Sequence, residues 1–237
     1  MTQDQRLDYL VEEFLEDSGE YRDVKIPKGR TEKQQILRSL MNVRMPKGLS
    51  GEVLEVQDAY LAARAAEKGV VDVEDIPTIQ THLSIWHGDI TRLKADAIVN
   101  AANSQMLGCF VPCHSCIDNC IHTYAGVQLR AECHRQMQDL RRKYGRDYEQ
   151  PTAVPMLTDA FNLPAKKVIH IVGPIVPPGA DFDALGRQKE KLERDLSDCY
   201  RNTLDICAEQ GLKSVAFCCI STGVFHFPNR RAAEIAT

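Results

Sequence analysis

The part of the sequence richest in potential metal ligands is a short cysteine-rich segment. Cys109, Cys113, Cys116 and Cys120 fall within twelve residues, and His114 lies among them. Zinc prefers thiolate and imidazole ligands, and catalytic zinc sites use three protein ligands so that one coordination position stays open. Either Cys109 or Cys113 completes such a triple with His114 and Cys116, and a four-ligand structural site that includes Cys113 fits as well. Cys120, in a predicted helix, is interpreted as a small buried hydrophobe.

Three further segments carry groups suited to a nucleotide or a sugar. In Gly88–Thr91, Asp89 could accept a hydrogen bond from a ligand amine, although aspartate commonly bonds its own backbone in a turn. Asn100 and Asn103 end a predicted strand, and their amides suit ribose hydroxyls or cap a loop. The glycine-bearing loop Ser221–Phe225 presents backbone N–H groups to a phosphate or forms a plain strand-to-helix turn.

Other residues of metal-ligating types are interpreted as packed structure. His122 falls in a predicted helix and His170 in a predicted strand, so both are expected to pack rather than to bind metal. Cys218 and Cys219 lie in an apolar run and are predicted to belong to the core.

The first 75 residues are predicted to form a helical extension. Apolar residues recur at helical spacing in three segments: residues 4–17, 31–41 and 51–68. Thr31 is predicted to cap the second helix, because Gln34 three residues later completes a capping-box pattern. We do not expect this extension to bury enough apolar surface to fold alone.

After the extension the pattern changes to strands that alternate with helices. The predicted strands are residues 79–90, 95–103, 167–174 and 212–220, and the predicted helices are residues 116–144 and 185–210. This alternation indicates an α/β fold in layers. The final residues, RRAAEIAT, read as the start of a helix, and a closing helix and strand are expected to follow it.

Composition excludes several classes of protein. The 237 residues carry a net charge of -4 with a pI of about 6.0, so we expect no specific nucleic-acid binding. The amino terminus lacks the pattern of a signal peptide, and no apolar run is long enough to span a membrane. Nine cysteines without a secretory signal argue against a disulfide framework. A cytoplasmic monomer is therefore predicted.

Taken together and in this order, the segments resemble the macrodomain family, and specifically its MacroD-like branch. The matching motifs are GDIT, DAIVNAANS, IDNCIH and STGVF, and the resemblance covers residues 83–237. It implies a three-layer α/β/α sandwich with a mixed sheet over residues 76–237, after a helical extension over residues 1–75. The loop GCFVPCHSCIDN departs from the usual glycine-rich loop and is similar to that of the zinc-containing microbial subgroup. That likeness implies Zn²⁺ ligands at Cys109, His114 and Cys116, with Cys113 at a variable position.

The resemblance also implies a cleft for ADP-ribose along the strand ends. Asp89 and the Ile90 amide would hold adenine, and Asn100 and Asn103 would lie near the distal ribose. Asp118 takes the position of a functional aspartate, so Asp118 and Asn103 are the expected catalytic residues. The diphosphate loop would consist of Ser221, Thr222, Gly223, Val224 and Phe225, the last of which would pack on the distal ribose.

The function implied is a zinc-dependent hydrolase that removes mono-ADP-ribose from protein side chains. An ADP-ribose reader without turnover is the alternative, and a redox or structural zinc module unrelated to nucleotides is a third interpretation. The expected partners are ADP-ribose and an ADP-ribosylated protein. The subgroup also suggests a sirtuin-type ADP-ribosyltransferase and a lipoyl-carrier protein.

Overall fold

Two apolar strands form the centre of the sheet in the computed structural model, which describes residues 1–237. β5 (Ala97–Ala102) and β7 (Lys167–Val172) run parallel and pair over their full lengths. β6 (Met156–Asp159) pairs antiparallel with β7, and β8 (Val215–Ala216) pairs parallel with β5, giving the strand order β6-β7-β5-β8. Because three strands are parallel and one is not, the sheet is mixed.

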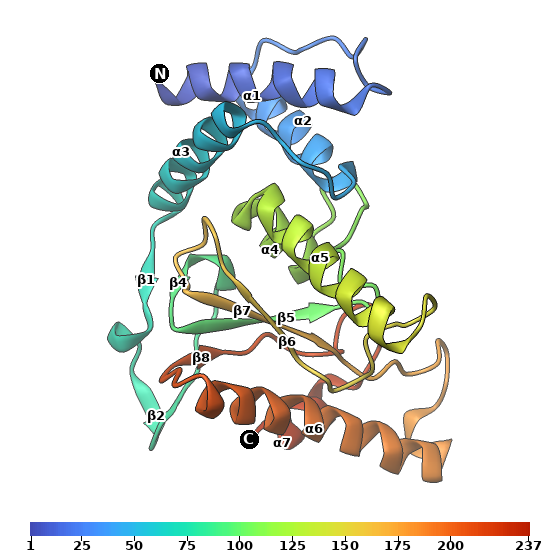
Figure 1. The fold of residues 1–237 in the computed structure, drawn as a ribbon. Coiled ribbons are helices and arrows are strands. Elements are labelled where there is room, and N and C mark those ends of the chain that lie inside the picture. Colours follow the sequence, from blue (N-terminus) through green and yellow to red (C-terminus); the bar gives the residue numbers. More distant parts are fainter.

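Helices cover both faces of this sheet (Figure 1). Successive strand residues point to opposite faces, so Ile98 packs under one helical layer and Val99 under the other. The first layer consists of α4 (Ile117–Ala125) and α5 (Val127–Tyr144). The second consists of α6 (Arg187–Glu209) and α7 (Asn229–Ala236). The chain therefore has the predicted three-layer α/β/α architecture.

The amino-terminal helices form an additional layer beside α4 and α5 (Figure 1). They are α1 (Gln3–Ser18), α2 (Arg30–Val43) and α3 (Gly51–Lys68). Their apolar faces meet in a core of their own, which contains Leu7, Leu10, Val11, Phe14, Leu15, Leu37, Leu40, Met41, Val53, Tyr60 and Leu61. The helical extension predicted from periodicity is therefore present. The division of the chain into an extension over residues 1–75 and a domain over residues 76–237 stays a prediction.

Short elements connect this layer to the sheet. β1 (Val71–Asp72) pairs parallel with β4 (Leu93–Lys94), and β2 (Thr78–Gln80) pairs antiparallel with β3 (Leu83–Ser84). Single turns of 3₁₀ helix occur at Val73–Asp75, Ile90–Arg92 and Phe182–Leu185.

Two predictions about the helices are wrong in detail. The second helix begins at Arg30 after Gly29, so Thr31 lies inside the helix and does not cap it. The single helix predicted for residues 116–144 is two helices, because the chain turns at Gly126 with φ 94°, a conformation that glycine tolerates better than other residues.

The predicted strands are corrected more strongly. Residues 79–90 form only the short β2–β3 pair, and Ile79 and Ile85 are exposed, so their alternation does not report a buried face. The run 212–220 is a strand only at Val215–Ala216, and Cys219 is exposed rather than part of the core. Cys218 packs against the apolar cores on both faces of the sheet. β6 is a strand that the sequence did not predict.

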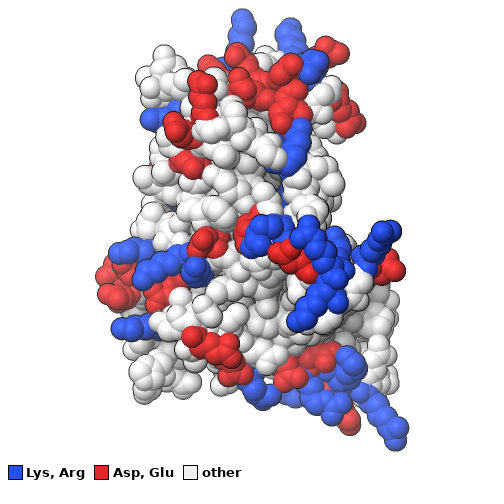
Figure 2. All heavy atoms as spheres, viewed as in Figure 1, with Lys and Arg blue, Asp and Glu red and all other residues white.

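The surface carries interspersed charges of both signs on the face that Figure 2 shows. Over the molecule as a whole, exposed charged residues form ion pairs such as Lys94 with Asp72 and Lys167 with Asp159. Exposed pairs of this kind contribute little to stability. None of the helices combines the length and the apolar composition that crossing a membrane requires.

Candidate functional site

The predicted site residues that follow β5 and β8 gather where the parallel strands end, whereas Asp89 and Ile90 precede β5, and Asp89 lies beside Lys68 of α3. β5, β7 and β8 point the same way, so the segments that follow them emerge at one edge of the sheet. Gly173 directly follows β7 and lies against Ser221 from the segment after β8. The cysteine-rich loop and α4 follow β5. In open α/β sheets this edge is where ligands bind.

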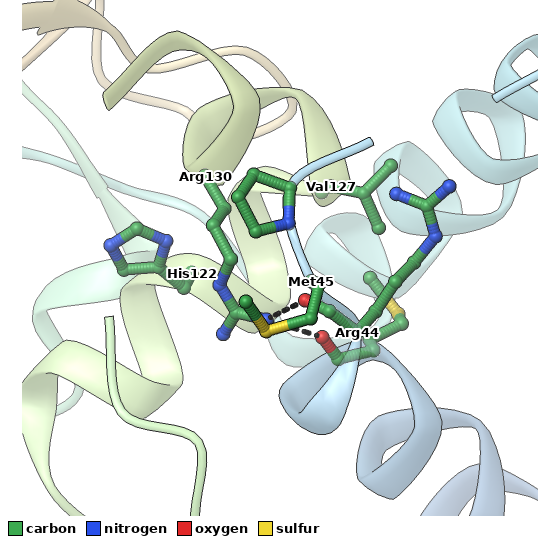
Figure 3. Close-up of a pocket in the computed structure, with 8 residues that line it drawn as sticks. Arg44, Met45, His122, Val127 and Arg130 are labelled. Carbon is green, nitrogen blue, oxygen red and sulfur yellow. Dashed lines mark hydrogen bonds between the residues drawn. The ribbon is translucent and has the colours of Figure 1, made fainter. Parts of the chain in front are cut away.

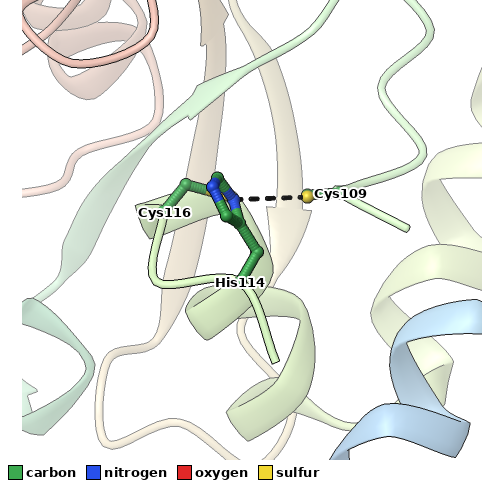
Figure 4. Close-up of side chains that lie close together, drawn as sticks. All are labelled: Cys109, His114 and Cys116. Carbon is green, nitrogen blue, oxygen red and sulfur yellow. Dashed lines mark hydrogen bonds between the residues drawn. The ribbon is translucent and has the colours of Figure 1, made fainter. Parts of the chain in front are cut away.

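The cysteine-rich loop brings three potential metal ligands together (Figure 4). The ligand atoms of Cys109, His114 and Cys116 all lie within 4.8 Å of one another, and Cys109 Sγ is 3.6 Å from His114 Nδ1. A sulfur and a nitrogen bound tetrahedrally to one zinc ion are about 3.5 Å apart, given the usual Zn–S and Zn–N distances. The donor types and their spacing therefore fit zinc.

The other two cysteines of the segment point elsewhere. Cys113 Sγ lies 3.2 Å from Ser39 Oγ and 3.4 Å from the carbonyl oxygen of Gln35, both in α2. Cys120 Sγ lies 3.6 Å from Arg38 Nη2. The triple with Cys113 in place of Cys109, which the sequence left open, is not assembled in this structure.

Cys116 also begins helix α4. Its Sγ accepts a hydrogen bond from the Asn119 backbone N–H at 3.4 Å, in the position of a helix cap. Burial, together with the neighbouring Cys109, raises the pKa of the Cys116 thiol to about 11. A thiol becomes a strong metal ligand as the thiolate, which a bound cation stabilises.

Asp118 lies in the first turn of α4 and is buried. Its Oδ1 accepts a hydrogen bond from Asn100 Nδ2 at 2.8 Å, and its Oδ2 accepts a long one from Asn103 Nδ2 at 3.5 Å. Burial raises the pKa of Asp118 to about 6, although the hydrogen bond from Asn100 and the charge of Arg130 act in the opposite direction. A carboxyl group that titrates near neutral pH in a strand-edge site is suited to proton transfer.

Asn100 is fixed by a buried hydrogen-bond network. Besides Asp118, its Nδ2 lies 3.0 Å from His170 Nδ1, and His170 Nε2 lies 3.0 Å from Thr158 Oγ1. Asn100 Nδ2 faces both Asp118 and His170, so the other polar atom of the amide, Oδ1, points away from these partners. Asn100 Oδ1 is a buried acceptor without a partner. An unpaired buried acceptor is costly, so this oxygen is a candidate contact for a ligand hydroxyl.

Two other polar residues of the motifs are engaged in their own turns. Asn103 Oδ1 accepts from the Gln105 N–H at 3.0 Å, and Asn103 Nδ2 donates to the Gly108 carbonyl at 3.2 Å. Asp89 accepts from the backbone N–H of Thr91 at 3.0 Å, as the turn interpretation expects.

Asp89 has a second partner that the sequence did not indicate. Lys68 Nζ, at the end of α3, lies 2.5 Å from Asp89 Oδ2 and 3.6 Å above the Tyr124 ring. Partial burial alone would raise the pKa of Asp89, but hydrogen bonds from Lys68 and Thr91 lower it instead. Asp89 is therefore an ionised acceptor, about a third exposed at 37%.

The loop Ser221–Phe225 has a buried start and an exposed centre. Ser221 has φ 64°, and its buried hydroxyl has no partner. A Cβ added at Gly173 would come within 2.1 Å of Ser221 Oγ, so only glycine there permits this approach. Val224 is 66% exposed, so the centre of the loop is open to a ligand.

A second group of metal-ligating types lies below the site. His122, Cys133 and His170 have ligand atoms within 4.8 Å of one another, and all three are buried. Both nitrogens of His170 already face polar partners, Asn100 and Thr158. The prediction that His122 and His170 pack inside the structure is confirmed.

Comparison with known proteins identifies the fold. A family model described as "Macro domain" matches residues 99–236. The chain belongs to the macrodomain family. The match begins within β5 and includes the cysteine-rich loop, α4 and the Ser221–Phe225 loop, whereas Asp89 and Ile90 lie before its first residue.

Similar sequences extend beyond the macrodomain itself. A protein-ADP-ribose hydrolase of Treponema medium is 46% identical over 240 residues, covering 100% of this chain and 87% of the relative. A protein-ADP-ribose hydrolase of Staphylococcus aureus strain MRSA252 is 41% identical over 233 residues, covering 98% of this chain and 82% of the relative. Both alignments include the helical extension.

Solved macrodomains have the same fold. A variant of the Oceanobacillus iheyensis macrodomain with ADPR has a TM-score of 0.52 at 36% identity, covering 63% of this chain and 70% of that chain. The Trypanosoma brucei macrodomain in complex with ADP-ribose has a TM-score of 0.57 at 27% identity, covering 89% of this chain and 82% of that chain. The second alignment covers so much of this chain that it includes part of the amino-terminal helices.

Proposed function

We propose that this macrodomain is a zinc-dependent hydrolase that removes mono-ADP-ribose from modified protein side chains. The observation that carries the proposal is the meeting of two groups at one sheet edge. Asp118, which is hydrogen-bonded to Asn100 of β5, lies two residues after Cys116, the last member of the cluster of Cys109, His114 and Cys116. Relatives named protein-ADP-ribose hydrolases, similar over the whole chain, support the reaction class.

ADP-ribose binding is proposed along the strand ends. Asp89 accepts a hydrogen bond from the adenine amine, and the Ile90 backbone N–H also binds adenine. Backbone N–H groups of the Ser221–Phe225 loop hold the diphosphate. The unpartnered Oδ1 of Asn100 accepts a hydrogen bond from a hydroxyl of the distal ribose, and Asn103 lies near the same ribose. Macrodomain structures that contain ADPR or ADP-ribose support this class of ligand.

The chemistry is proposed to occur between Asp118 and the cysteine-rich loop. Zinc with three protein ligands would supply an open coordination position that orients the distal ribose or lowers the pKa of a water. Asp118 positions the attacking water near C1″ of the distal ribose or accepts its proton, and Asn100 directs the Asp118 carboxylate by hydrogen bonding. A bond forms between the water oxygen and C1″ as the bond from C1″ to the side-chain oxygen or nitrogen breaks, so ADP-ribose takes the hydroxyl group of the water and the released side chain takes its proton.

The linkage determines how much acid assistance the leaving group requires. A carboxylate leaves more easily than a serine alkoxide, because it is the weaker base. Purified protein should therefore be tested on peptides with defined Ser, Asp/Glu and Arg linkages, with and without a chelator. We expect release that chelation removes and added zinc restores. Equal turnover without metal would overturn zinc dependence, and binding without release on every linkage would identify a reader.

A pair of cysteine variants tests the metal ligands separately from the fold. Cys116→Ser is expected to abolish release, because serine is a poor zinc ligand at neutral pH. Cys113→Ser is the matched control, since Cys113 lies in the same loop with its Sγ toward α2. Circular dichroism should show both variants folded. Wild-type turnover in Cys116→Ser, or equal loss in both variants, contradicts the proposed ligand set.

A further inference from the structure

Helix α2 of the amino-terminal layer lies against the cysteine-rich loop and α4 (Figure 1). Three of its residues, Arg38, Ser39 and Asn42, contact the loop or the helix that follows it. Arg38 and Asn42 are four residues apart and share one face of the helix, and Ser39 lies about 100° around the axis from Arg38, so the contacts come from neighbouring faces of α2. These faces carry polar groups, unlike the apolar stripe that packs against α1 and α3.

Arg38 reaches the end of the loop. Its Nη2 donates to the carbonyl oxygen of His114 at 2.7 Å and to Asn119 Oδ1 at 2.8 Å. The first acceptor belongs to a proposed metal ligand, and the second belongs to the first turn of α4. One guanidinium nitrogen therefore holds both sides of the segment that contains Cys116.

Asn119 extends this contact to the rest of the loop. Its Nδ2 donates to the carbonyl oxygens of Val111 at 2.9 Å and Cys109 at 3.3 Å, and its backbone N–H donates to Cys116 Sγ at 3.4 Å. Arg38 donates only to an acceptor, so it keeps Oδ1 toward α2 and Nδ2 toward the loop. All three proposed ligands are thus within one or two hydrogen bonds of Arg38.

Asn42 fixes the middle of the loop. Its Oδ1 accepts from the backbone N–H of Cys113 at 2.9 Å, and its Nδ2 donates to Thr123 Oγ1 at 2.9 Å. Cys113 has φ 53°, a conformation unusual for a side chain with a Cβ. The contact with α2 stabilises this turn immediately before His114.

Arg130 of α5 connects the start of the loop to the end of α2 (Figure 3). Its Nε donates to the Leu107 carbonyl at 2.7 Å, and its Nη1 donates to the carbonyl oxygens of Met41, Asn42 and Arg44. The last carbonyls of a helix have no partner within the helix, so Arg130 satisfies them. The loop is therefore bound to α2 through its beginning, middle and end.

We propose that α2 holds the cysteine-rich loop in the geometry that brings Cys109, His114 and Cys116 together, with Arg38 as the positioning residue. The inference rests on the proposed function for the identity of the metal. The loop has no regular secondary structure, so forming three-ligand geometry without such contacts would require ordering it on metal binding. The amino-terminal helices are then a structural part of the metal site.

The test compares zinc affinity in two arginine variants of the same helix. Arg38→Ala removes the contacts with His114 and Asn119. Arg30→Ala is the matched control, because Arg30 begins α2 and pairs only with Asp4 and Glu67. Competition against a chromophoric chelator should show zinc affinity reduced about 10- to 100-fold in Arg38→Ala, as for other residues that orient metal ligands. Affinity in Arg30→Ala should equal that of the wild type.

Hydrogen exchange of the metal-free protein gives a second measurement that does not depend on zinc. Amides of residues 109–116 should exchange faster in Arg38→Ala than in Arg30→Ala, while amides of β5 and β7 stay protected. Should Arg38→Ala fail to fold, Arg38→Lys keeps the charge but loses the directed pair of hydrogen bonds and should show the same two changes. Wild-type affinity and wild-type exchange in the Arg38 variants overturn the inference. A wild-type protein that binds no zinc contradicts the proposed function instead, and the exchange measurement still decides the role of α2.

Discussion

The two ends of the candidate site are built differently. At the end beside the proposed metal ligands, called the metal end below, Asn100 and Asp118 are 0% and 5% exposed and are held by side chains from distant parts of the chain. At the other end, backbone hydrogen bonds rather than side-chain networks hold the Ser221–Phe225 loop: Phe227 N–H donates to the Ser221 carbonyl and Val176 N–H to the Phe225 carbonyl, both at 2.9 Å. Its Val224 is largely exposed.

The difference follows from what each end is proposed to do. Reacting groups must be placed accurately before the substrate arrives, and buried side-chain networks provide that accuracy. An anionic diphosphate needs only accessible backbone N–H groups, which a short loop presents by itself. We therefore expect changes at the metal end to affect turnover and changes at the other end to affect binding.

The largest expected effect is on turnover at the metal end. Asp118→Asn keeps the size of the side chain but removes the carboxylate, so single-turnover release should fall about 10²- to 10⁴-fold, the usual contribution of a general acid or base. Calorimetry should show ADP-ribose binding close to that of the wild type. Full turnover in the variant would refute the catalytic role of Asp118.

A smaller effect is expected on binding at Asp89, the residue proposed to hold adenine away from the metal end. Asp89→Ala removes an ionised acceptor and should weaken ADP-ribose binding by about 2 kcal/mol, or about 30-fold, as measured by calorimetry. Asp72→Ala is a matched control, because Asp72 also caps a 3₁₀ turn and pairs with a lysine, Lys94, outside the cleft. Undiminished affinity in Asp89→Ala would remove its proposed role in holding adenine.

The smallest effect is expected where two strand-end segments touch. Gly173→Ala places a methyl group 2.1 Å from Ser221 Oγ and must displace the Ser221 side chain at the start of the loop. We expect ADP-ribose affinity to fall by about 1 kcal/mol, or about fivefold, with zinc content unchanged. Gly48→Ala adds the same methyl group in open space and should change neither. Lost zinc in Gly173→Ala would show that the two ends are not independent.

Much of the fold could be predicted because its signals are local. The stripes of α1 and α3 repeat at helical spacing, and β5 and β7 are apolar runs interrupted internally only by Asn100 and His170. Prediction failed where local pattern and tertiary environment disagree. Residues 79–90 alternate like a strand, but the strand residues among them pair only within the two-stranded β2–β3 sheet. β6 was missed because it is only four residues long, at the antiparallel edge of the main sheet.

The site was predictable as residue types but not as a set of contacts. Family resemblance, rather than spacing, selected Cys109 over Cys113, and the structure shows the two Sγ atoms facing different neighbours. Arg38 and Lys68 gave no signal, because surface-type cations on predicted helices normally face water. Arg38 and its partner Asn119 are 81 residues apart in the sequence (119 − 38). Lys68 and its partner Asp89 are 21 residues apart (89 − 68).

The sequence by itself determined the chemistry available at the strand ends: thiols and an imidazole, a carboxyl group, amides and a glycine-bearing loop. These follow from residue type and from order along the chain. Only the tertiary structure decided which thiols meet, that Asp118 is buried beside Asn100, and that α2 lies against the cysteine-rich loop. The physical reason is that burial and hydrogen bonding depend on packing between segments far apart in sequence, which local propensity does not encode.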